Sequence, residues 1–60
     1  MINVAYITYD QEVVESIKNF YEIDFTSNHI VFRMDEHDKN NLIAIKADRI
    51  FELIVEKEEL

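Results

Sequence analysis

YEIDFTSNHIVFRM, residues 21–34, holds two short runs of alternating apolar residues on either side of Ser27-Asn28. A two-residue loop at Ser27-Asn28 would join these runs as an antiparallel hairpin. The opposite pairs are then Phe25 with Ile30, Ile23 with Phe32 and Tyr21 with Met34 on one face, and Glu22 with Arg33 and Asp24 with Val31 on the other. A slip of one residue would lose both the apolar face and the Glu22–Arg33 charge pair. The sequence therefore favours this one register between the two strands.

The same alternation continues after residue 34. A turn centred on Asp38-Lys39 extends the hairpin to a three-stranded meander over residues 20–47. The predicted pairs are Ile43 opposite Met34, Ile45 opposite Phe32, and Ala47 opposite Ile30. We predict further strands over 3–9 and 49–56, and a single helical turn over 47–50.

The turns of this chain must form without glycine or proline, because neither residue is present. Asn and Asp are the other residues that best tolerate a positive φ. Turns are therefore expected at Asp10-Gln11, at Ser27-Asn28 and within 35–41.

Residues 11–21 allow two interpretations. Val13, Val14, Ile17, Phe20 and Tyr21 have helical spacing, which suits a β-α-β-β-β arrangement. The β-branched pair Val13-Val14 instead favours a strand. Ile, Val, Thr, Phe and Tyr make 23 of the 60 residues, so the prediction is a mainly β fold: a small antiparallel meander with short helical turns.

The chain forms one small domain, residues 1–60, whose own core is marginal at this size. Without cysteine it has no disulfide to stabilise that core. Several predicted strands also carry apolar residues on the face opposite the predicted core, which one small sheet leaves exposed. We therefore expect the fold to be completed by homodimerisation; the alternative is a small barrel or closed sandwich that uses both faces within one chain. The candidate interface residues are Val31, Leu42, Ala44, Ile50 and Ile54.

The charge indicates what kind of partner the chain binds. Thirteen acidic against six basic residues give a net charge of −7, which repels phosphate backbones and anionic lipid. We expect a protein partner with a basic surface, no membrane partner, and cytoplasmic localisation. The candidate partner-binding residues are Asp35, Glu36, Asp38, Glu56, Glu58 and Glu59.

The sequence gives little indication of catalysis. Asp35-Glu36-His37-Asp38 is the densest polar cluster, but it lacks the glycine and the ligand spacing of a calcium loop. The two serines have no recognisable triad spacing, and a glycine-rich phosphate loop is impossible. We predict a protein that is not an enzyme, with no metal and no cofactor.

The chain as a whole, small, acidic, cysteine-free and β-rich, resembles the proteins with which phages block bacterial immunity. Nine Ile, five Asn and only two Arg are typical of AT-rich coding. The short Hachiman anti-defence proteins are similar in size and character. The resemblance implies a non-catalytic inhibitor that occludes a bacterial defence complex; it assigns no role to any residue.

A second resemblance covers residues 43–54, IAIKADRIFELI. A strand, an acidic turn and a further apolar element also occur near the end of carbon-storage-regulator proteins, which are strand-exchanged RNA-binding dimers. It implies the alternative function, a small regulatory nucleic-acid-binding β dimer. That family uses basic edges, from which this acidic chain departs.

Overall fold

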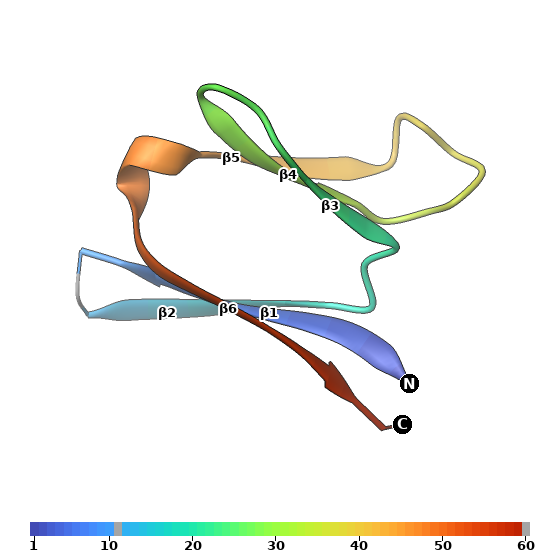
Figure 1. Cartoon of the computed structure of the whole chain (residues 1–60), viewed down its shortest axis with the longest axis horizontal. Coiled ribbons are helices and arrows are strands. Elements are labelled where there is room, and N and C mark those ends of the chain that lie inside the picture. Colours follow the sequence, from blue (N-terminus) through green and yellow to red (C-terminus); the bar gives the residue numbers. More distant parts are fainter. Residues whose placement is uncertain (11, 60) are drawn as a thin grey trace.

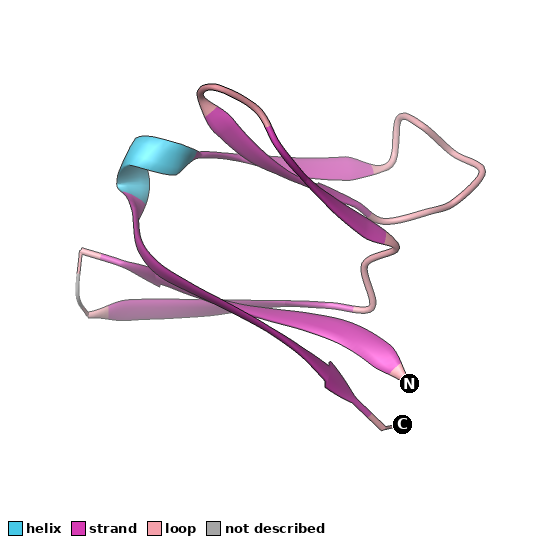
Figure 2. Ribbon diagram, viewed as in Figure 1, coloured by secondary structure: helices cyan, strands magenta, loops and turns pink. Residues whose placement is uncertain are grey.

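The computed structural model describes residues 1–10 and 12–59 and is mainly β, which confirms the predicted fold class (Figure 1, Figure 2). Its elements are β1 (Ile2–Tyr9), β2 (Val13–Lys18), β3 (Glu22–Phe25), β4 (His29–Arg33), β5 (Leu42–Lys46), the 3₁₀ turn η1 (Ala47–Arg49) and β6 (Ile50–Glu58). The described residues include no α-helix, so the β-α-β-β-β alternative is wrong: residues 13–18 form a strand that pairs with β1. The predicted turn at Asp10-Gln11 has its Asp10 at φ 46°, while Gln11 lies outside the described residues.

The strands form two antiparallel sheets of three, in the orders β2-β1-β6 and β3-β4-β5 (Figure 1). The chain passes between the sheets twice, through residues 19–21 and through η1, the helical turn expected from the sequence. The two sheets enclose a common core between their facing sides. The topology therefore completes one apolar core within a single chain.

The first crossing is a sharp bend at Asn19, whose φ is 61°. The Asn19 backbone N–H donates to the carbonyl of Asn3 (2.7 Å), and that of Tyr21 donates to the carbonyl of Arg33 (2.7 Å). The Asn3 side-chain amide also donates to the Phe20 carbonyl (2.9 Å). The chain thus exchanges β1 for β4 as its hydrogen-bonding partner within three residues.

The hairpin predicted around Ser27-Asn28 is confirmed. β3 and β4 pair as Glu22–Arg33, Ile23–Phe32, Asp24–Val31 and Phe25–Ile30. The Thr26 N–H donates to the His29 carbonyl (2.9 Å), which closes the two-residue loop. The hairpin ladder ends at Glu22–Arg33, so the predicted Tyr21–Met34 pair lies beyond it.

The predicted register between β4 and β5 is wrong by two residues. Ile43 lies opposite Phe32 rather than Met34, and Ile45 lies opposite Ile30 rather than Phe32. The same residues still face the core, because a shift of two preserves the alternation. The reason for the shift is the loop 34–41, whose aspartate side chains fold it into local turns.

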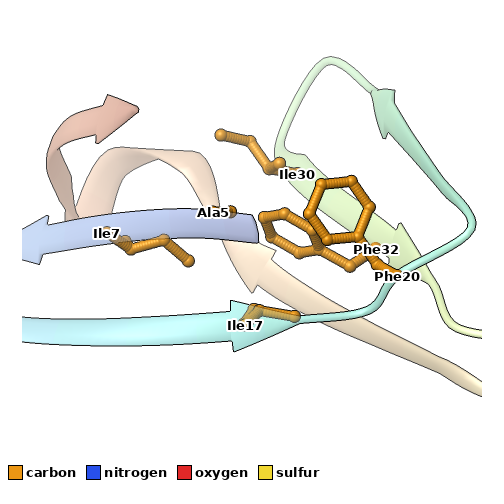
Figure 3. Close-up of a cluster of buried hydrophobic side chains, with 6 residues drawn as sticks. All are labelled: Ala5, Ile7, Ile17, Phe20, Ile30 and Phe32. Carbon is orange, nitrogen blue, oxygen red and sulfur yellow. The ribbon is translucent and has the colours of Figure 1, made fainter. Parts of the chain in front are cut away.

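The core lies between the sheets and is apolar throughout the described residues (Figure 3). Its central cluster is Ala5, Ile7, Ile17, Phe20, Ile30 and Phe32. The rings of Phe20 and Phe32 pack edge to face, with centroids 5.2 Å apart and planes at 73°. Phe20 comes from the bend between the sheets and Phe32 from β4, and both belong to one cluster with Ala5 and Ile17 of the other sheet.

A β-bulge alters the expected alternation of β6. Thr8 lies opposite Glu52 and Tyr9 lies opposite Ile50, which leaves Phe51 as an extra residue. Ile50 was predicted on the outer face with Ile54, but the bulge turns it toward the core, against which it packs. Phe51 is left 62% exposed.

Candidate interaction surfaces

Many large apolar side chains remain exposed on the described chain. Ten of them are at least 40% exposed: Met1, Val13, Val14, Tyr21, Phe25, Leu42, Ile43, Phe51, Ile54 and Val55. Single exposed apolar residues are ordinary, but contiguous groups of them mark interaction surfaces. Their positions on the strands therefore decide which surfaces are candidates.

Three of the predicted interface residues lie together on the outer face of the sheet β3-β4-β5. Val31 lies directly opposite Ala44, and Leu42, on the same face, is 46% exposed. Arg33 borders this group, and its guanidinium lies 3.8 Å from the Glu22 carboxylate. The outer face is an apolar strip beside an ion pair.

The other two interface candidates lie elsewhere. Ile54 is on the outer face of the sheet β2-β1-β6, opposite Tyr6, and is 44% exposed. Ile50 packs against the core. The five residues therefore occupy three separate places, and the use of any of them in a dimer stays a prediction.

The loop 34–41 displays three of the predicted partner-binding residues, Asp35, Glu36 and Asp38, all exposed. Asp35 Oδ1 accepts the backbone N–H groups of His37 (2.8 Å) and Asp38 (3.4 Å). These bonds stabilise the carboxylate and hold the pKa of Asp35 below its ordinary value of 3.8. Asp38 Oδ1 accepts the N–H of Asn40 (3.0 Å). The loop is therefore an acidic projection ordered by its own side chains.

Of the remaining partner-binding candidates, Glu56 and Glu58 lie in the last part of β6 and Glu59 follows the strand. Glu58 lies opposite Ile2 at the start of β1. Asp35 and Glu36 line a hollow of about 330 Å³ together with that same start of β1. Loop 34–41 and both ends of the chain thus lie at one end of the molecule (Figure 1).

The hydroxyl of Tyr6 donates a hydrogen bond to Glu58 Oε2 across β1 and β6. This bond is the main reason why the pKa of Tyr6 is raised above its ordinary value of 10.0, followed by desolvation and by the negative charges of Glu58 and Glu56. A raised pKa favours the neutral phenol in the folded chain. Its contribution to stability is therefore complete below pH 10.0 and is lost as the pH rises above that value.

Glu58→Gln is expected to lower the pKa of Tyr6 toward its ordinary value, because the variant removes the carboxylate that accepts the bond and repels the phenolate. An ultraviolet absorbance titration measures this change, with Tyr6 assigned by difference against Tyr6→Phe. Glu59→Gln removes the neighbouring charge and is the control. Equal titration curves for Glu58→Gln and Glu59→Gln would contradict the assignment.

An open cleft of about 470 Å³ lies near the η1 end, lined by Tyr9, Asp10, Val13, Glu15, His29, Ala44, Ile45, Lys46 and Arg49. Burial raises the pKa of Tyr9 above 10.0, the Glu15 charge raises it further, and Arg49 lowers it. The lining mixes acidic groups, Asp10 and Glu15, with basic groups, Lys46 and Arg49. In residues 1–10 and 12–59, no three acidic or histidine side chains are grouped to hold a metal ion.

The sequence did not indicate which apolar side chains lie on edge strands, or that β6 contains a bulge at Phe51. Val13, Phe25, Phe51 and Val55 are each 49% exposed or more. Val13, Phe25 and Val55 lie on edge strands, and Phe51 is the extra residue of the bulge. Strand order and bulges depend on contacts between distant segments, so no local pattern revealed them.

A comparison of this chain with protein-family models, with curated proteins and with solved structures finds no match. No helix of the described residues is long and apolar enough to cross a bilayer.

Proposed function

We propose that this chain is a non-catalytic inhibitor or adaptor that binds a protein with a basic surface. The observation that carries the proposal is the exposure of ten large apolar side chains within residues 1–10 and 12–59. Contiguous exposed apolar groups, such as the strip of Val31, Leu42 and Ala44, are typical of surfaces that contact other proteins. The acidic loop 34–41, ordered by Asp35 and Asp38, selects a basic partner by charge complementarity.

The partner in this proposal is a bacterial defence complex, which a phage-encoded inhibitor blocks by occlusion. The support is the resemblance in size, acidity and β content to anti-defence proteins. The chain would act as a bound obstacle, in the cytoplasm of the host cell. No step of this function requires a catalytic residue or a cofactor.

The test is phage plating on bacteria that carry one cloned defence system each, with and without expression of this chain. Restored plating with one system, and co-elution of the chain with that purified complex, would support the proposal. Unchanged plating with every system would oppose it. A mobility shift of short RNA or DNA at low salt would favour the nucleic-acid-binding alternative.

The acidic loop provides a sharper prediction. The triple variant Asp35→Asn, Glu36→Gln, Asp38→Asn removes three charges and keeps the acceptor oxygens that order the loop. We expect the association rate with the identified partner to fall about tenfold or more at low salt, and less at high salt. Surface plasmon resonance at two salt concentrations measures the effect.

The control variant removes the same number of charges elsewhere, by Glu12→Gln, Glu15→Gln and Asp24→Asn. It shares the change in net charge and therefore the change in long-range attraction. An equal loss of rate in both variants would place the contact outside loop 34–41.

A further inference from the structure

β6 is the longest strand of the chain and lies at the edge of its sheet. One side of β6 pairs with β1, and no other strand in the described part of the chain pairs with its second side. An unpaired strand edge presents a row of backbone N–H and C=O groups that favours pairing with another strand. Nine residues of β6 offer such an edge.

The first part of this edge is unusually apolar for an unprotected strand. Residues 50–55, IFELIV, contain a single charged residue, Glu52. Phe51 is 62% exposed, Val55 49% and Ile54 44%. Charged residues, which commonly protect edge strands, are concentrated instead at Glu56, Lys57 and Glu58.

Symmetry restricts how two copies of β6 pair. A two-fold axis perpendicular to the sheet makes the strands antiparallel and places both core-facing sides on the same side of the joined sheet. Each residue must then lie opposite one that faces the same way, so the axis passes midway between the two copies of one residue of β6. Each possible register is therefore named by its central residue.

The charges of β6 distinguish these registers. A register centred on Glu52, Glu56 or Lys57 places the two copies of that charged residue opposite each other. A register centred on Ile54 places Glu52 opposite Glu56. A register centred on Val55 places Glu52 opposite Glu58. Like charges directly opposite each other destabilise a strand pair. Among the centres from residue 52 to residue 57, only Leu53 gives no like-charge pair within β6, and it places Glu52 opposite Ile54.

We infer that β6 pairs antiparallel with β6 of a second copy of this chain, in the register centred on Leu53, to form a continuous six-stranded sheet. The pairing covers the exposed edge of Val55 and brings two Leu53 side chains together beside both cores. It adds buried apolar surface to a chain whose own core is marginal at this size. The inference concerns the chain alone and goes beyond the proposed function.

Ile54→Asp is expected to convert a dimer to a monomer, since each new carboxylate lies opposite Glu52 of the other copy, twice per dimer. Adding Glu52→Lys in the same chain is expected to restore the dimer, because Lys then lies opposite Asp at both positions. Val14→Asp, on the same outer face but on β2, is the control and keeps the dimer. Sedimentation equilibrium of the purified chains measures these states.

Cysteine cross-linking tests the register independently, and the natural chain has no cysteine to interfere. In the register centred on Leu53, the two copies of residue 53 lie opposite each other, within about 4.5–5.5 Å. The two copies of residue 54 or 55 are offset along the strands beyond the roughly 7 Å that a disulfide spans. Under mild oxidation, Leu53→Cys is expected to form a cross-linked dimer, and Ile54→Cys and Val55→Cys are not.

A monomeric natural chain, or a dimer that persists in Ile54→Asp, would overturn the inference. Cross-linking at 54 or 55 instead of 53 would overturn the register. If Ile54→Asp fails to fold by circular dichroism, the three cysteine variants decide the matter. These outcomes are separate from partner binding, because no partner is present in the experiments.

Discussion

Phe32→Ala is expected to lower the free energy of unfolding by about 3–5 kcal/mol, a large share of the stability of this chain. Phe32 has no exposed surface, and its ring packs edge to face on Phe20 between the two sheets. Truncating a buried phenylalanine costs about 3–5 kcal/mol of the free energy of unfolding. Proteins have about 0.05–0.15 kcal/mol of stability per residue, or roughly 3–9 kcal/mol for this length. The substitution therefore removes a large share of the total.

Urea denaturation followed by circular dichroism measures this loss, at a fixed chain concentration because association alters apparent stability. Phe25→Ala is the matched control: Phe25 lies on the neighbouring strand but is 68% exposed. We expect a loss of about 0.5 kcal/mol or less for a substitution at such a surface position. Equal midpoints for the two variants would show that Phe32 does not hold the sheets together.

The hairpin β3–β4 was predictable because two independent features agree on one register. The apolar alternation and the Glu22–Arg33 pair both require Ser27-Asn28 as the loop, and the structure has that register. Between β4 and β5 only the alternation is available, and alternation does not distinguish registers two residues apart. The hydrogen bonds of Asp35 and Asp38 settle the length of that loop, and their geometry is not apparent from composition.

Residues 11–21 were ambiguous for a different physical reason. The helical spacing of Ile17, Phe20 and Tyr21 arises because the bend at Asn19 interrupts the alternation of one continuous extended segment. The bulge at Phe51 has a similar effect on β6 and moved Ile50 from the outer face to the core. Acidic candidate residues were easier to place on the surface, since charged side chains are rarely buried. Which apolar residues remain exposed depends on strand order.

Asn19→Val is expected to destabilise the chain by about 1–3 kcal/mol, because a β-branched residue fits poorly in the left-handed region. Asn19 has a φ of 61° and directly follows β2. Its backbone N–H donates to the carbonyl of Asn3 in β1, just before the chain turns toward β4. Asn19→Gly is expected to be tolerated with little loss, since glycine adopts a positive φ without a steric penalty. Asn40→Val, in an exposed loop without a positive φ, is the control for the loss of an asparagine side chain.

The same urea experiment distinguishes the four chains. A loss in Asn19→Val that Asn19→Gly does not share would assign the effect to the backbone conformation at the bend. Equal losses in both would assign it to the asparagine side chain and contradict the prediction. The bend also fixes how the sheet β3-β4-β5, with its acidic loop, is placed relative to β6.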